Sequence, residues 1–458
     1  MRIGIRLGGT QAHGALLAGG RVRAAGTARL GGAPHRALSG LLRQLAGEAA
    51  GRIHSVTWDV SALLDGALYP PVRRVAALRL QPRPARTCSL ADHPSSLVRS
   101  LVNWRGHATG GHDLFGGELA ELDIPAVLRL VEPFGTVEDA APGSAAVLAV
   151  TATGAVSCAD HERAVAERVL GRCPRLRVCL SHEVGGIGLL EREAATVLNA
   201  ALLGAAEQIA GRCVRATDAL PGPPSCWFTT GDGGRMSPER LRSLPVLGIG
   251  SERAAGLLGA AILSEQPNAL IMVTGTDTAV VGRVHDGLPQ VAADLPGPSG
   301  VRLAAPQAVL TTTAAGMAPE MVAAYVEHDP GAAVVLAVAA GAANGHGDAR
   351  ALADRLGADT GRRAVLLDGA ADPGAVGAAG AEPSAWLDLM INAVTPEELR
   401  RQLAEAEQRA LTMVAAGGAQ PGRERIVESV AYSLPFIRSG TYRLHVRASG
   451  APGQGEDG

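Results

Sequence analysis

The sequence contains no lysine: all 42 basic residues in its 458 positions are arginines. This absence excludes Schiff-base chemistry and the lysine of a phosphate-binding P-loop. Aromatic residues make up only 3% of the chain, so alanine, valine and leucine must fill the buried cores. Together with the excess of alanine and glycine, the missing lysine indicates a coding bias rather than a functional choice.

Further absences narrow the class of protein. The net charge of −2 argues against a basic surface for nucleic acid or anionic membranes. The six cysteines form no Cys-x-x-Cys pair, which argues against zinc ribbons and thioredoxin-like sites. No uncharged apolar run reaches the ~18 residues of a membrane span, and Arg2 and Arg6 within the first apolar run argue against a signal peptide. We therefore expect a reduced, cytoplasmic protein.

A supersecondary pattern occurs twice. Residues 2–7 alternate as a strand, Gly8-Gly9-Thr10 forms a turn, and two further strands follow around the hairpin signal Gly19-Gly20. Residues 269–273 and 279–284 repeat the pattern on either side of a Gly-Thr turn. Two such copies predict two similar α/β halves that face a cleft.

The patterns in the rest of the chain predict mixed α/β structure. We expect an N-terminal lobe over 1–190, a second lobe over 191–385 and a C-terminal helix with strands over 386–447. Thr395, Pro396 and Glu398 predict the capped start of that helix, and a polar, Gly-rich tail follows over 448–458.

Five stretches of the sequence carry a resemblance to a known family. They are 2–10; the dense block Asp160-His161-Glu162, Ser181-His182-Glu183, Glu191-Arg192, Thr196 and Asn199; Gly231 to Ser237 with 256–260; 272–279; and the weaker 328–330, 351–357 and 428–429. With these stretches the chain resembles the A-subunit family of ATP-dependent hydantoinases, oxoprolinases and acetone-type carboxylases.

The resemblance implies an α/β, actin-like ATPase fold, two-lobed and duplicated, with a small C-terminal α+β element. It implies ATP and Mg²⁺ as cofactors, a small-molecule ligand in the cleft between the lobes, and a hydantoinase B-like or homologous A-type subunit as partner. The residues implied in cofactor binding are Gly8, Gly9, Thr10, Gly233, Gly234, Gly256, Gly275, Thr276 and Thr278. Such glycines let backbone N–H groups approach phosphates, and the threonine hydroxyls donate to them.

The acids that the family carries beside these turns are missing. The first falls at Arg6 and the later one at His13; in the second turn they fall at Met272 and Ala279. Arginine and methionine cannot ligate Mg²⁺, and alanine cannot act as a base.

Asp277, Asp232 and Glu183 are the candidates for a replacement catalytic role. Arg6 has a second interpretation as a direct phosphate anchor, since a guanidinium binds phosphate well. No residue is predicted as a metal ligand.

Two function hypotheses follow. The first is an ATP-dependent enzyme subunit, either a hydrolase that opens a cyclic amide or a carboxylase. The second is a nucleotide-dead pseudoenzyme that serves as scaffold or regulator of a homologous partner, and the lost acids favour it for the ATP chemistry. A cleft repurposed for a reaction without nucleotide is a third possibility.

Two histidine-containing segments suggest chemistry that a plainer role explains. Ser181-His182-Glu183 is consecutive, whereas a catalytic triad is a spatial arrangement, so we expect a structural or interlobe role. His107 and His112 fit no metal-binding spacing and are interpreted as loop histidines.

Overall fold

The computed structural model describes residues 1–31, 34–69, 75–83, 93–135, 147–274, 278–297, 300–314, 317–328, 331–338, 345–362, 364–367 and 369–452. Gly275, Thr276 and Asp277 of the second turn lie outside the described residues.

The first lobe is built on an antiparallel three-stranded meander. Strand β1 (Arg2–Leu7) pairs with β2 (Gln11–Ala18), and β2 pairs with β3 (Arg21–Arg29). On its other side β1 pairs in parallel with β4 (Ser55–Asp59), which pairs in parallel with β9 (Ser225–Thr229). Helix α1 (Pro34–Gly47) connects β3 to β4.

The second lobe repeats this topology. Strand β11 (Ala269–Thr274) pairs antiparallel with β12 (Thr278–His285), which pairs with β18 (Leu310–Ala314); β11 also pairs in parallel with β19 (Ala333–Val338), next to β20 (Ala364–Leu366). Its helices are α10 (Ala318–His328) and α11 (Gly345–Thr360). The predicted duplication is confirmed, because both lobes share one strand order with the same directions.

Two helices pack closely where the lobes meet. They are α9 (Ser251–Ser264) and α12 (Pro373–Gly380). A Cβ atom on Gly259 of α9 would stand 1.7 Å from the carbonyl oxygen of Pro373, and one on Gly377 of α12 would stand 1.8 Å from that of Ala255. Glycine is required at this crossing because any side chain would collide with backbone.

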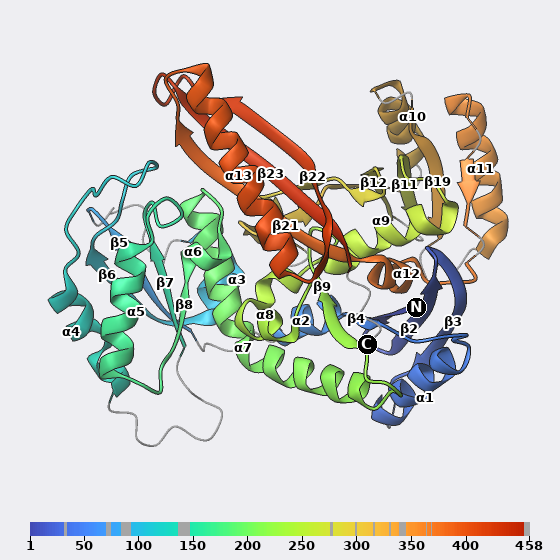
Figure 1. Cartoon of the computed structure of the whole chain (residues 1–458), viewed down its shortest axis with the longest axis horizontal. Helices are drawn as coiled ribbons and strands as arrows, with labels where there is room; N and C mark the ends of the chain where they lie inside the picture. Colours follow the sequence, from blue (N-terminus) through green and yellow to red (C-terminus); the bar gives the residue numbers. More distant parts are fainter. Residues whose placement is uncertain are drawn as a thin grey trace.

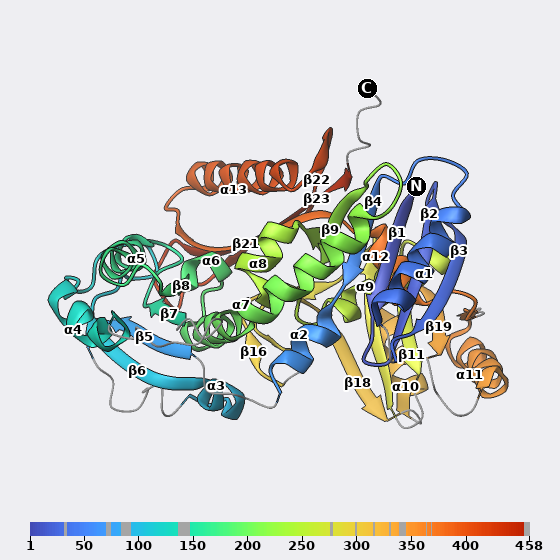
Figure 2. The same cartoon turned by 90° about the horizontal axis from the view of Figure 1, so that it is seen from below.

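A four-stranded parallel sheet is inserted between β4 and β9. Its order is β6-β5-β7-β8, and it forms one end of the molecule, with the two lobes at the other (Figure 1). The elements between β4 and β9 are α2 (Ser61–Ala67), β5 (Val75–Gln81), α3 (Ser96–Leu101), β6 (Val102–Thr109), α4 (Ile124–Gly135), β7 (Val147–Ala152), α5 (Asp160–Arg172), β8 (Arg177–Leu180), α6 (Ser181–Val184) and α7 (Leu189–Asp218). Strand β10 (Gly234–Met236) follows β9. The long helix α7 runs from this sheet to the first lobe (Figure 2).

The C-terminal element extends the sheet of the first lobe. Strand β21 (Glu382–Asn392) pairs with β10 and with β23 (Thr441–Pro452), which pairs with β22 (Ala419–Ser433), giving nine strands in the order β22-β23-β21-β10-β9-β4-β1-β2-β3. Helix α13 (Pro396–Ala416) begins with the predicted capping box of Thr395 and Glu398.

The tail predicted over 448–458 is wrong at its start. Residues 448–452 are the end of β23, where backbone pairing with β21 and β22 outweighs the Gly-rich composition, and 453–458 lie outside the described residues. The boundary expected at 190 separates β9 and β10 from the sheet that they join. The other domain limits stay a prediction.

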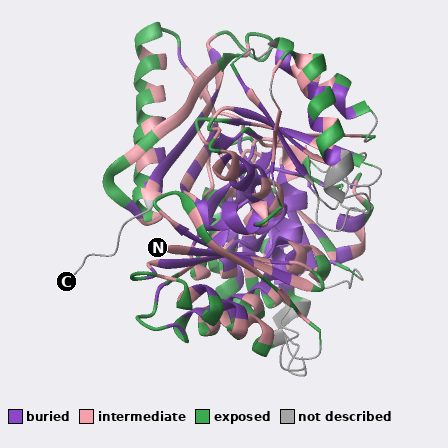
Figure 3. Cartoon of the chain, turned by 90° about the vertical axis from the view of Figure 1, so that its right-hand side faces the viewer, coloured by how far each residue is buried: buried purple, intermediate pink, exposed green. Residues whose placement is uncertain are grey.

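The buried residues concentrate in the middle of the molecule (Figure 3). Large side chains of the first core include Trp58, Phe228 and Ile3, all fully buried. No helix among the described residues is long and apolar enough to span a membrane.

Candidate functional site

The carboxyl ends of β1 and β4 meet the start of three helices. Arg6 lies next to Asp59 in the strand register. Helix α2 begins at Ser61, α9 at Ser251 and α12 at Pro373, and the Ser251 hydroxyl donates to Asp59 Oδ1 over 3.0 Å. Helix N-termini carry partial positive charge and unsatisfied N–H groups, so this is where the fold favours an anion.

The chain's own carboxylates occupy these helix ends. Asp59 Oδ1 accepts hydrogen bonds from the backbone N–H and the hydroxyl of Ser61, at 3.1 and 2.9 Å. Asp372 caps α12 by accepting from the N–H of Ala375 at 2.9 Å. Burial, together with nearby Glu252, raises the pKa of Asp59, although its hydrogen bonds oppose the rise. Two positions suited to phosphate oxygens are therefore already filled.

Arg6 forms a bidentate ion pair with Asp372. Its Nε donates to Oδ1 at 2.8 Å and its Nη2 to Oδ2 at 2.6 Å. Burial opposes the charge on Asp372, but the hydrogen bonds and the charge of Arg6 outweigh it and hold the pKa of Asp372 below its usual range. Gly374 makes the approach possible, because a Cβ there would lie 2.5 Å from Arg6 Cδ. Arg6 is thus held by the protein itself.

Asp372 is not available to hold Mg²⁺, although the buried Oδ2 of Asp59 has no hydrogen-bond partner among the described residues. Both oxygens of Asp372 accept from a guanidinium, and a cationic side chain stands where the resemblance implies an acid. Mg²⁺ demands near-octahedral oxygen ligands. No group of three His, Cys, Asp or Glu side chains within the described ranges is arranged to hold a metal ion. The ring of His112 packs against His161, with centroids 4.2 Å apart.

The first Gly-Thr turn is exposed at its tip. Gly8 N–H donates to the Gln11 carbonyl at 2.8 Å, which closes the turn, and Gly9 and Thr10 are exposed. A Cβ on Gly9, or on Gly256 of α9, would meet nothing within 4 Å. Neither Gly8 nor Gly9 has a positive φ. The fold itself does not require glycine at Gly9 or Gly256, and both leave room for a ligand.

In the second hairpin, the strand register differs by one residue from the positions that the resemblance gives for the two acids. Met272 and Ala279 are fully buried in the core under α10 and α11. In the first hairpin, Arg6 pairs with His13, and this pair is the last but one before the turn. In the second hairpin, the last pair but one before the turn is Val273 with Val280. Because strand side chains alternate, these two valines stand where Arg6 and His13 stand. Thr278 is exposed at the start of β12.

Asp232 and Glu183 line the same pocket, of about 660 Å³, with Arg235 and Arg240. Asp232 is buried, with Oδ1 accepting from the Thr230 hydroxyl and Oδ2 from the Ser384 hydroxyl at 2.6 Å. Glu183 is exposed. The pocket joins these two candidates, but a catalytic role for either stays a prediction.

The glycines beside Asp232 have structural reasons. Gly233 has a φ of +83°, and a Cβ on Gly234 would stand 1.8 Å from Ser384 Oγ. The Arg447 guanidinium donates to the carbonyl oxygen of Asp232 at 2.6 Å and fixes this loop against β23. Cofactor binding by Gly233 and Gly234 stays a prediction.

The dense block of the resemblance forms a buried polar cluster. Glu162 accepts from the Ser181 hydroxyl at 2.5 Å and from the His182 ring at 2.7 Å. Arg192 donates to Ser181 Oγ at 2.9 Å and to the carbonyl of Ala152 at 2.6 Å. These bonds join α5, β7, α6 and α7. The polar groups of Ser181 and His182 are thus used in packing the inserted sheet, and their structural role stays a prediction.

Sequence reasoning did not single out Asp59 and Asp372. A signal was present for each: Asp59 ends a buried strand two residues before a helix, and Asp372 precedes a proline, as an N-cap does. Their proximity to Arg6 had no sequence signal, since Asp372 is 366 residues away from it.

The comparisons with known proteins establish the fold. Neither the models of known protein families nor the curated protein sequences match the chain. Among solved structures, it is similar to an ATP-dependent caprolactamase from Pseudomonas jessenii, with 15% identity and a TM-score of 0.69. It is also similar to the nucleotide-free structure of acetone carboxylase, with 13% identity and a TM-score of 0.61. Each match covers 98% of this chain and 87% of the other. The predicted two-lobed, actin-like fold is confirmed.

Proposed function

We propose that this chain is a non-hydrolysing A-type subunit of the hydantoinase, oxoprolinase and acetone carboxylase family. It keeps the two-lobed fold and acts as scaffold or regulator for a B-like or homologous A-type subunit. The Arg6–Asp372 ion pair carries this proposal, because it puts a fixed positive charge where the resemblance implies a metal-holding acid.

The ion pair opposes metal-assisted ATP hydrolysis mainly because Arg6 occupies both carboxylate oxygens of Asp372. An unpaired guanidinium would repel a unit positive charge about 4 Å away by about 4 kcal/mol at an effective dielectric constant near 20, and the charge of Asp372 offsets part of this repulsion. Phosphoryl transfer in such sites depends on metal ions that neutralise developing charge. The two solved neighbours are described as ATP-dependent, so this chain would differ from them in its chemistry rather than in its fold.

The exposed turn at Gly8–Thr10 supports ligand binding without hydrolysis. Gly9 and Gly256 leave space that the packing does not use. A small molecule, including a nucleotide, bound between this turn and α9 would regulate the partner by shifting the relative positions of the lobes.

The tip of the C-terminal element supports a partner contact. Phe436 is 82% exposed and Val394 is 79% exposed, and a hydrogen bond from Ala393 to the Gly440 carbonyl places Val394 beside the β22–β23 connection that holds Phe436. Large exposed apolar side chains that gather in one place mark interaction surfaces.

The test is ATP hydrolysis and ATP binding by the purified chain, with Mg²⁺ and with EDTA. We expect no Mg²⁺-dependent hydrolysis from the natural sequence. Arg6→Asp replaces the guanidinium by a carboxylate beside Asp59 and Asp372, so we expect its melting temperature to rise with added Mg²⁺. A matched control is Arg23→Asp, which makes the same charge change at an exposed position of β3.

Either of two results would contradict the proposal. One is hydrolysis by the natural chain that Mg²⁺ stimulates and EDTA abolishes. The other is an equal Mg²⁺ effect on the melting temperatures of the natural chain, Arg6→Asp and Arg23→Asp.

A further inference from the structure

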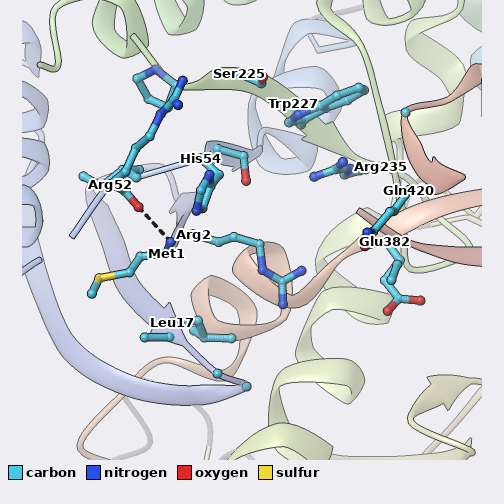
Figure 4. A pocket seen from close by; sticks show the side chains of 18 of the residues that line it. Met1, Arg2, Leu17, Arg52, His54, Ser225, Trp227, Arg235, Glu382 and Gln420 are labelled. Atoms are coloured by element: carbon cyan, nitrogen blue, oxygen red, sulfur yellow. Dashed lines mark hydrogen bonds between the residues drawn. The ribbon is translucent and has the colours of Figure 1, made fainter. Parts of the chain in front are cut away.

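A second pocket lies at the opposite end of β1 from the Gly8–Thr10 turn. Its volume is about 700 Å³, and the amino ends of β1, β4 and β9 form its floor. Arg2 of β1, His54 just before β4 and Arg235 of β10 line it (Figure 4). Arg52 and Arg423 also line it. The lining therefore joins segments from the beginning, the middle and the end of the chain.

Arg235 is the best-defined group in this pocket. Its side chain is buried, with the residue only 6% exposed, and its guanidinium carbon lies 4.2 Å from the centre of the Trp227 ring. Its Nε has no hydrogen-bond partner among the residues that the structure describes. A buried donor without a partner costs free energy that a bound acceptor would restore.

Arg2 shares this environment. Its Nη1 is buried and has no hydrogen-bond partner within the described part of the chain. Burial, and then the charge of Arg2, lower the pKa of Arg235 to about 9, whereas Glu382 opposes the change. Like charges are thus brought together in a poorly solvated space, which an anion would neutralise.

The acidic side chain of the pocket, Glu382, already accepts hydrogen bonds from residues of the chain. Glu382 Oε2 accepts from Arg425 Nη2 at 2.9 Å and from the Ser449 hydroxyl at 3.0 Å. Among the described lining residues, Glu382 is the single carboxylate side chain, against four arginines. The pocket therefore keeps a net positive charge.

We propose that this pocket binds a small multivalent oxyanion, either a phosphate group or a polycarboxylate, through Arg2 and Arg235. Guanidinium groups recognise both chemistries with paired, charge-assisted hydrogen bonds. Contact with the Trp227 ring restricts the Arg235 guanidinium, which reduces the entropy lost on binding. This site is separate from the Gly8–Thr10 turn, because Arg2 and Arg6 lie at opposite ends of β1, and Arg235 also borders the neighbouring pocket of Asp232 and Glu183.

The experiment is calorimetry with pyrophosphate and, separately, with citrate, using the full chain in EDTA. We expect saturable binding of at least one of them, and the tighter of the two identifies the chemistry. Arg235→Met and Arg2→Met each weaken this binding about 10-fold or more, since each removes charge-assisted hydrogen bonds. Arg400→Met is the matched control, because Arg400 is exposed on α13 and paired with Glu397.

A variant that is expected to strengthen binding controls for loss of folding. Glu382→Gln removes the negative charge and should tighten binding several-fold, which an unfolded or damaged protein would not do. Higher ionic strength should weaken binding in every variant. No saturable heat with either anion, or equal weakening by Arg235→Met and Arg400→Met, would overturn the proposal. Binding that survives Arg235→Met and Arg2→Met would place the anion elsewhere and would also overturn it.

Discussion

Strand β1 holds an arginine at each end, and the two arginines have opposite surroundings. Arg6 and Arg2 are four residues apart and so project from the same face of the sheet. Arg6 meets Asp372 in a two-bond ion pair, whereas Arg2 keeps a buried nitrogen without a partner. The difference shows that residue type does not decide the role. The Arg6 guanidinium is paired with a carboxylate of the chain, whereas the Arg2 guanidinium stays available to an anion.

The largest expected effect comes from removing the partner of Arg6. Asp372→Ala leaves the guanidinium without its carboxylate and deletes the N-cap of α12. We expect a loss of about 3 kcal/mol in the free energy of unfolding, measured with urea. Asp354→Ala, at an exposed position of α11, should change this free energy by less than about 0.5 kcal/mol. Equal losses in the two variants would mean that the pair contributes nothing.

The next effect is a dependence on pH. The pKa of Asp372 is below its usual range in the folded chain, so its ionisation stabilises the fold above the unfolded pKa of about 4. This stabilisation is lost as the pH falls from about 4 through the lower folded value. Asp372→Asn keeps a side-chain acceptor for the cap but has no such titration. The difference in unfolding free energy between the natural chain and this variant should therefore shrink in that window; a difference that stays constant or grows there would contradict the assignment.

The smallest effect is expected at the other end of β1. Arg2 forms no ion pair with the residues that the structure describes, and burial lowers its pKa, with Glu382 opposing the change. Arg2→Met should change the free energy of unfolding by less than about 1 kcal/mol, without the added anion. Arg6→Met should cost about 2 kcal/mol, because it strands the largely buried Asp372. Similar costs from the two substitutions, in parallel urea titrations, would remove the contrast between the two ends.

Local patterns made much of the fold predictable. The alternation of residues 2–7 and 269–273 is a short-range signal of strands, and the capping box at Thr395 is contained in four residues. The repeat of strand, turn and strand was enough to predict the duplication. The register was predicted less well, because a one-residue offset in a strand moves a side chain to the other face. Met272 illustrates this: it was compared with a site acid, but it faces the core.

The sites depended on contacts that no local pattern contains. The sequence by itself determined the strand repeats, the lack of lysine and the arginine at position 6. Only the tertiary structure decided that Asp372 neutralises Arg6, and that Arg2 and Arg235 share one pocket. The physical reason is that an arginine has the same charge everywhere. Its role follows from burial and from the groups that the fold brings within hydrogen-bonding distance, here from segments hundreds of residues apart.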